Sequence, residues 1–320
     1  MLNEKGSSLY CCLFVVWLRA RCLREGRRQV LSDAWRFCGS FSPINEDIVI
    51  CTNNTCNIYS KENFLSKDNL IPKNQNKIES KDDYVYSKFS DDGKFLYTSD
   101  FEFNIKKYEI ENNYNLSQTF QPGNLKNWKF ALSKDNKYLV TGCYNVILYN
   151  TNNPTKEKEI SNGSKFIYSF CFLPNNKLAV GNSNGSVHII NLETSKIEKR
   201  IDEHCMIVRC LSYFSEKNIL LTASDDLHIN LIDLNNYKLI VPIVGHHDSI
   251  SQMIVNDNKK LLYTSSFDGS VKVFDLKNSN KCLANLSEGK DNIIWDLGVS
   301  KNGNFICSIG ENHLSAYSII

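Results

Sequence analysis

The chain has 320 residues, of which 42% are hydrophobic, and its formal net charge is +2 at pH 7. This composition supports a sizeable core and excludes a strongly basic nucleic-acid-binding or membrane-surface protein. The twelve cysteines form no CxxC pair and no Cys/His group with zinc-finger spacing. We therefore expect reduced, mostly buried thiols and no metal site.

The first 28 residues differ in composition from the rest. Six of the eight arginines lie within the first 36 residues, and Leu9–Leu18 is an apolar run. The run is too short to span a bilayer, and most positive charges follow it, which is the reverse of a secretory signal. We interpret residues 1–28 as an Arg- and Cys-rich extension, either disordered or derived from an incorrect gene model; a membrane anchor or targeting segment is the alternative. Residues 29–320 are predicted to form one domain.

Short β-branched and aromatic runs recur along that domain, and each ends in an apolar or aromatic residue followed by a polar one. These residues are 49, 41, 41, 42, 42 and 43 positions apart: Tyr59, Tyr108, Tyr149, Ile190, Ile232, Phe274 and Tyr317. A polar turn rich in Asp, Asn, Gly and Pro recurs in step with them, as in FSDDGK from Phe89. These intervals predict an all-β, seven-bladed WD-repeat β-propeller with four short strands per blade. The longest interval contains Lys61–Asp83, whose polar composition predicts a loop insertion.

WD blades often carry an internal hydrogen-bond chain, in which a His bonds an Asp in a tight turn and the Asp orients a Ser or Thr. The Ser or Thr of such a chain reaches a Trp on the third strand, and here Ile232 and Phe274 stand in the place of that Trp. Two repeats contain the other three residues: His204, Asp226 and Thr222, then His246, Asp268 and Thr264. The same residue types could form a catalytic triad. We interpret them as structural tetrads because both sets occupy equivalent repeat positions. No phosphate-binding loop or metal-ligand cluster is present, so we predict neither enzymatic activity nor a cofactor.

A second repeat position lies four residues before the apolar residue that precedes each polar turn. In a propeller this position begins the innermost strand, so its side chains should surround the mouth of the central channel. The residues there are Trp35 (after a small shift of the first repeat), Val85, Trp128, Tyr168, Arg209, Ser251 and Trp295. Trp, Tyr and Arg are enriched in interface hot spots. The position therefore predicts a partner site; the alternative is that these side chains only plug the channel.

Five segments resemble the small WD-repeat subunit of the superkiller (Ski) complex. They are NWKFALSKDNKYLVTG (127–142), GSKFIYSFCFLPNNKLAVGN (163–182), HCMIVRCLSYFSEKNILLTASDD (204–226), GHHDSISQMIVNDNKKLLYTSSFDGSVKVFDL (245–276) and IIWDLGVSKNGNFICSIGENHLSAYSI (293–319). The resemblance covers residues 123–320 in register, and residues 30–122 match only as repeats. The GxKFI and MxVR…LLTASDD pieces are more specific than a general WD pattern.

The resemblance implies a non-catalytic scaffold that binds a helical-repeat subunit, which carries the RNA helicase that feeds RNA to the exosome for 3′-to-5′ mRNA decay. In animals and plants the family also joins the RNA polymerase II-associated factor (Paf) complex, with a role in transcription elongation. By motif match the partner face would include Trp128, Lys165, Phe166, Tyr168, Met206, Arg209 and Trp295.

We accordingly expect a monomeric subunit of a hetero-complex, cytoplasmic and also nuclear if the Paf role exists, without direct nucleic-acid or membrane binding. The alternative function is a WD-repeat adaptor of another assembly, such as a ubiquitin ligase, a ribosome-associated complex or a chromatin complex. The chain departs from the family in three ways. The repeat around Val146 has a shortened turn without Asp, and no repeat has Trp in the usual place. The strand that should close the last blade falls by spacing at 23–30, a poor strand sequence, with 9–16 as the alternative.

Overall fold

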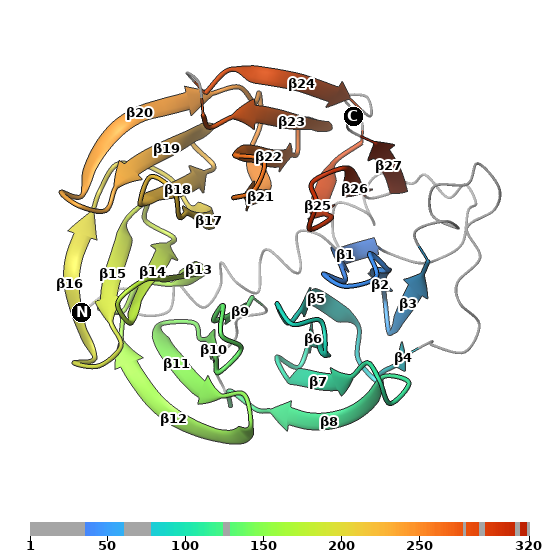
Figure 1. Ribbon diagram of the computed structural model, residues 1–320. Coiled ribbons are helices and arrows are strands. Elements are labelled where there is room, and N and C mark those ends of the chain that lie inside the picture. Colours follow the sequence, from blue (N-terminus) through green and yellow to red (C-terminus); the bar gives the residue numbers. More distant parts are fainter. Residues whose placement is uncertain are drawn as a thin grey trace, which may run out of the picture. The chain divides into compact units, whose positions relative to one another are not determined.

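The computed structural model describes residues 36–60, 78–123, 129–277, 280–287, 292–310 and 314–318. All of them belong to a compact unit that spans Trp35–Ile320. They form seven antiparallel sheets, which Figure 1 shows as the blades of a ring. The predicted all-β, seven-bladed propeller is therefore confirmed.

Each blade is one sheet whose strands follow chain order from the channel to the rim (Figure 1). The first three blades comprise β1 (Arg36–Phe41), β2 (Ile48–Thr52), β3 (Thr55–Tyr59), β4 (Ile78–Glu79); β5 (Tyr84–Phe89), β6 (Phe95–Asp100), β7 (Ile105–Glu109), β8 (Asn115–Phe120); and β9 (Ala131–Leu132), β10 (Tyr138–Thr141), β11 (Asn145–Asn150), β12 (Asn153–Ser161). The next two comprise β13 (Ile167–Leu173), β14 (Lys177–Asn182), β15 (Val187–Asn191), β16 (Lys196–Ile201); and β17 (Val208–Phe214), β18 (Ile219–Ser224), β19 (His228–Asp233), β20 (Lys238–Val244). The last two comprise β21 (Ile250–Asn256), β22 (Leu261–Ser266), β23 (Ser270–Asp275), β24 (Cys282–Ser287); and β25 (Ile294–Val299), β26 (Phe305–Gly310), β27 (Leu314–Ser318).

The repeat pattern of the sequence matches the strand order. The seven recurring residues from Tyr59 to Tyr317 all lie on the third strand of their blades, and the polar turns join first to second strands. The predicted loop insertion Lys61–Asp83 is wrong in part, because β4 lies inside it and pairs with β3 as the fourth strand of the first blade. Both candidates for the closing strand, 23–30 and 9–16, lie outside the described residues.

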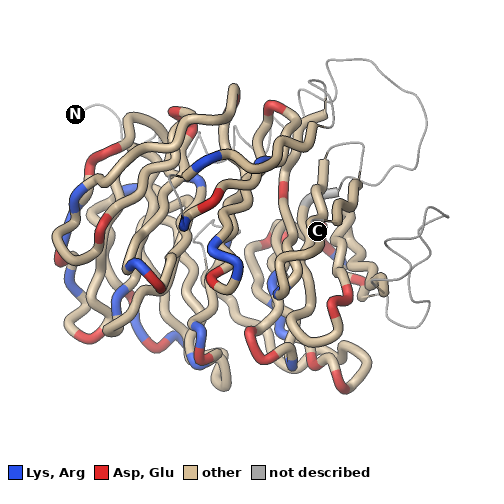
Figure 2. The backbone as a smooth tube through the Cα atoms, turned by 45° about the horizontal axis from the view of Figure 1, so that its top comes forward, with Lys and Arg blue, Asp and Glu red and all other residues tan. Residues whose placement is uncertain are grey.

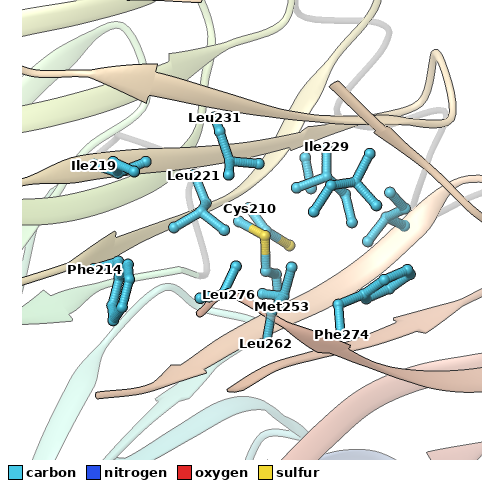
Figure 3. Close-up of a cluster of buried hydrophobic side chains, with 13 residues drawn as sticks. Cys210, Phe214, Ile219, Leu221, Ile229, Leu231, Met253, Leu262, Phe274 and Leu276 are labelled. Carbon is cyan, nitrogen blue, oxygen red and sulfur yellow. The ribbon is translucent and has the colours of Figure 1, made fainter. Parts of the chain in front are cut away.

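The core lies between neighbouring blades, where the flat faces of the sheets meet. Second strands are buried along their length, as β18 is, because a neighbouring blade covers each face. Between the fifth and sixth blades, Phe214, Leu221 and Cys210 pack against Met253 and Leu262 (Figure 3). Phe274, which stands where many WD blades have Trp, is 2% exposed in the same cluster. Burying such a side chain stabilises the fold by about 1.5–3 kcal/mol.

The first and last blades also pack against each other. Phe41 and Ile50 of the first blade share an apolar cluster with Cys307 and Ile309 of the last. Gly39 makes this approach possible, because a Cβ at that position would collide with the Val49 carbonyl and the Ile309 side chain. The ring of described blades is thus closed by β1 against β25 and β26.

The outermost strands differ in chemistry. Exposed residues of β12 and β16 are mainly Lys, Glu and Arg, and Figure 2 shows the two signs of charge interspersed over the unit. In contrast, β20 exposes Leu239, Ile240, Val241 and Val244, with Pro242 among them. No helix within the described ranges is both long and apolar enough to cross a membrane.

Candidate protein-interaction site

The repeat position assigned to the mouth of the channel is a β-bulge. In six blades the pairing of the first strand shifts register around one extra residue. The six extra residues are Phe37, Val85, Tyr168, Arg209, Ser251 and Trp295. A bulge residue has no cross-strand partner, and in the five blades other than the first the bulge turns its side chain away from the ladder. We call these six positions the bulge ring.

Two tryptophans of the predicted partner face, Trp35 and Trp128, lie outside the described residues. In the first blade the bulge falls at position 37, two residues after Trp35. Counting four residues back from Phe41 without any shift would have selected Phe37, so the sequence held the signal for this residue. Trp128 occupies the corresponding place in the third repeat by spacing alone.

Several predicted partner-face residues join one continuous set of aromatic and cationic contacts, which we call the aromatic arc: Tyr144, Phe166, Tyr168, Arg209, Phe267 and Trp295. Ring centroids lie 5.6 Å apart for Tyr144–Phe166, 5.0 Å for Phe166–Tyr168 and 4.9 Å for Phe267–Trp295. The Arg209 guanidinium joins the two halves, 5.9 Å from the Tyr168 ring and 5.5 Å from the Phe267 ring. The arc therefore runs across five blades, from the third to the seventh, and every member is half-buried.

Asp225 fixes the central residue of the arc. The Arg209 side chain donates Nη2–H to Asp225 Oδ2 at 2.7 Å and Nε–H to the other carboxylate oxygen. The two side chains are only 14% and 8% exposed. Such a two-point pair holds the planar guanidinium in one orientation, and it thus keeps the cation between two aromatic faces.

Sequence reasoning missed Tyr144 and Phe267. Both lie in the turns between the second and third strands of their blades, and the only signal in the sequence was an aromatic residue in such a turn. The turn at Tyr144 is the one predicted to be shortened. Gly142 has φ 138° there, and a Cβ would collide with the Asn145 carbonyl, so this turn requires glycine.

The other predicted residues lie beside the arc or beneath it. Met206 is 49% exposed on the loop before β17, and Lys165 is half-buried next to Phe166. Ser251 occupies a bulge but is 7% exposed, and its hydroxyl lies 2.8 Å from the Ser265 hydroxyl. It therefore offers little surface to a partner.

The His–Asp–Thr sets come together within each blade, but their order differs from the expected one. His204 Nδ1 lies 2.8 Å from Asp226 Oδ2, and its Nε2 lies 2.7 Å from the Thr222 hydroxyl. The matching distances from His246 to Asp268 and Thr264 are 3.0 and 2.7 Å. The histidine is therefore the central residue. The expectation that Asp orients Thr was wrong, because the imidazole has two nitrogens on opposite edges and bridges them.

The local hydrogen bonds favour the ionised form of the two carboxylates, Asp268 and Asp226. Burial acts to raise the pKa of Asp268, but hydrogen bonds from His246, Ser270 and the His247 amide outweigh it and lower that pKa well below its ordinary value. The pKa of Asp226 is lowered in the same way, with His204 opposing burial. The two threonines are fully buried at 0% exposure, so neither hydroxyl can reach a substrate. This geometry does not fit a nucleophilic triad.

The fourth blade holds a different polar network in the equivalent place. His188 Nδ1 lies 2.8 Å from Asn162 Oδ1, and Asn162 Nδ2–H donates to Asn182 Oδ1 at 2.7 Å. Asn182 in turn donates to the Ser186 hydroxyl at 3.1 Å. Burial lowers the pKa of His188, and the positive charge of Arg200 lowers it further. Within the described ranges, no group of His, Cys, Asp and Glu side chains could hold a metal ion.

The comparisons with known proteins agree with this architecture. Residues 237–275 match the family model "WD domain, G-beta repeat". The chain is 31% identical over 155 residues to WD repeat-containing protein SL1-17 of Schistosoma mansoni, covering 47% of this chain and 50% of the relative. It is 27% identical over 164 residues to COMPASS component SWD3 of Saccharomyces cerevisiae, covering 50% and 51%, and 27% identical over 144 residues to human striatin, covering 42% and 18%. The chain thus spans about half the length of the first two relatives and less of the third. Seven sheets in a ring give the chain a seven-bladed β-propeller fold, and the family match identifies a WD40 repeat within residues 237–275.

Proposed function

We propose that this propeller is a non-catalytic scaffold that binds another protein subunit through its aromatic arc. The arc carries the proposal, because it gathers Trp, Tyr, Phe and Arg side chains from five blades into one partly exposed surface. Binding surfaces draw most of their energy from such residues. The fixed Arg209–Asp225 pair also means that little side-chain entropy remains to be lost when a partner docks.

The comparisons favour an adaptor of a multi-subunit assembly without specifying which one. One relative is, by its name, a component of COMPASS, and we propose that this chain is likewise one subunit of a larger complex. A chromatin-type assembly is the first candidate. The second is a Ski-type complex with a helical-repeat subunit and an RNA helicase, which is supported by the sequence resemblance at Phe166, Met206 and Arg209. As a subunit of a chromatin-type assembly the protein would be nuclear, and as a subunit of a Ski-type complex it would be cytoplasmic.

Affinity purification of the tagged chain from its own cells tests this proposal, with Trp295→Ala and Tyr168→Ala compared with the wild type. We expect each substitution to weaken capture of the main partner by about thirtyfold or more, as for a hot spot of about 2 kcal/mol. Tyr213→Ala is the matched control. It also removes a half-buried aromatic side chain, at the opposite end of the strand that carries Arg209.

The partners that are recovered decide between the candidates. Chromatin subunits would favour the first, and a helical-repeat protein with a helicase would favour the second. Equal recovery of the same partners by the wild type, both arc variants and the control would contradict the proposal that the arc is the binding surface.

A further inference from the structure

Directly after each bulge residue, the first strand carries a residue that faces the neighbouring blades around the channel. We call these the second circle, and we add Lys129, which precedes β9 at the same offset in the third repeat: Cys38, Tyr86, Lys129, Ser169, Cys210, Gln252 and Asp296. Ser169, Cys210 and Asp296 are 3–5% exposed. Nothing in the repeat pattern singles out these positions, because their residue types differ from blade to blade.

From the fourth blade onward, members of the second circle bond to the next blade. The Ser169 hydroxyl donates to the Val208 carbonyl at 2.9 Å, and the Cys210 thiol donates to the Ser251 carbonyl at 3.2 Å. Gln252 Nε2–H donates to Asp296 Oδ1 at 2.9 Å. These contacts link the fourth blade to the fifth, the fifth to the sixth and the sixth to the seventh.

Asp296 completes the series at the contact between the last and first blades. Its Oδ2 accepts the Gly39 N–H at 3.0 Å, and its Oδ1 also accepts the Leu297 N–H at 2.9 Å. One buried carboxylate thus receives hydrogen bonds from the first, sixth and seventh blades. Asp296 directly follows Trp295 on β25.

The backbone groups that receive these bonds belong to the bulges. Ser251 and Arg209 are bulge residues, and the Val208 carbonyl belongs to the peptide unit that leads into Arg209. Lys129 Nζ donates to the Arg209 carbonyl at 3.1 Å, from the third blade to the fifth. Gly181 leaves room for the Ser169 bond, because a Cβ there would collide with both the Ser169 hydroxyl and the Val208 carbonyl.

We propose that the second circle positions the binding surface: its cross-blade bonds hold the bulges in place, and Asp296 is the residue that holds Trp295 and closes the contact between the first and last blades. A surface built this way is preorganised, because the cross-blade hydrogen bonds already fix the backbone that carries its side chains. The inference rests on the proposed function only where it calls the aromatic arc, whose Tyr168, Arg209 and Trp295 are bulge residues, a binding surface.

The experiment needs no partner, so its failure is distinguishable from failure of the proposed function. The full chain is labelled with 5-fluorotryptophan, and the Trp295 ¹⁹F resonance is assigned with Trp295→Phe. Asp296→Asn, which replaces one of the two acceptor oxygens with an NH2 group that cannot accept, is expected to shift and broaden this resonance. Hydrogen exchange at the Gly39 amide is expected to become about ten- to a hundredfold faster, as for loss of a hydrogen bond to a charged group.

Asp226→Asn is the matched control, since it makes the same change in a network confined to the fifth blade. It should leave the Trp295 resonance and Gly39 exchange unchanged. Gln252→Met, which removes only the donor from the sixth blade, is a milder variant that serves if Asp296→Asn does not fold, and it should shift the same resonance. Unchanged Trp295 and Gly39 signals in a folded Asp296 or Gln252 variant would overturn the proposal, as would equal changes in Asp226→Asn.

Discussion

The fourth and sixth blades contain buried polar groups at the same place but hydrogen-bond them with different side chains. Both must satisfy buried polar groups between the loop that enters the blade and the turn between its second and third strands. The sixth blade uses a histidine between a carboxylate and a hydroxyl. The fourth uses two asparagines, a serine and a histidine that comes from the third strand. The requirement is a fully bonded network, and no particular residue type is needed to meet it.

The two networks should differ most when the central residue is removed. His246→Leu in the sixth blade leaves the ionised Asp268 and the Thr264 hydroxyl without their shared partner. We expect the free energy of unfolding to fall by about 3 kcal/mol or more, because burial lowers the pKa of His246 and a buried carboxylate that loses the hydrogen bond from this neutral imidazole costs more than an unsatisfied neutral group. Urea denaturation with an unchanged m-value would measure this loss. A loss below about 1 kcal/mol would mean that Asp268 finds other partners at no cost.

The neutral network should lose less. Asn162→Ala in the fourth blade removes the amide between His188 and Asn182 and leaves no buried charge uncompensated. We expect a loss of about 1–3 kcal/mol, typical of an unsatisfied neutral polar group. The same urea titration measures it. A loss as large as that of His246→Leu would show that charge is not what separates the two blades.

The smallest difference should appear in the dependence of stability on pH. Because burial lowers the pKa of His188, the unfolded chain binds a proton below about pH 6.5 that the folded chain does not. The wild type therefore loses stability as pH falls from 7.5 to 5.5, and His188→Gln should lose less over that range. In the sixth blade, burial also lowers the pKa of His246, which reduces stability over the same range as His188 does. The lowered pKa of Asp268 adds a second window there: its contribution is present above about pH 4 and is lost at lower pH. Parallel stability curves for wild type and His188→Gln between pH 7.5 and 5.5 would contradict this assignment.

The blades could be predicted from the sequence because the signal repeats. Seven apolar or aromatic residues at regular intervals each lie on a third strand, and the bulge position follows at a constant offset from the turn. The first repeat shows the limit of this reasoning. There a conspicuous Trp35 favoured a shift that the bulge at position 37 does not need.

Features that depend on two blades meeting could not be predicted in the same way. Tyr144 and Phe267 belong to the arc only because the packing of neighbouring blades brings their turns beside Phe166 and Trp295. The second circle has no common residue type, so its bonds become visible only in three dimensions. Asn162 and Asn182 could not be predicted as network residues for a different reason. The chain is rich in asparagine, so the sequence does not distinguish these two from the others.

The outer strand of the fifth blade has a consequence for how the molecule behaves in concentrated solution. An edge strand that exposes Leu239, Ile240 and Val241 is a template for strand-by-strand stacking into fibrils. Pro242 interrupts that template, because proline has no amide hydrogen and is accommodated at a sheet edge with its nitrogen toward the open side. The strand can therefore carry an apolar surface while resisting growth into a continuous cross-β ladder.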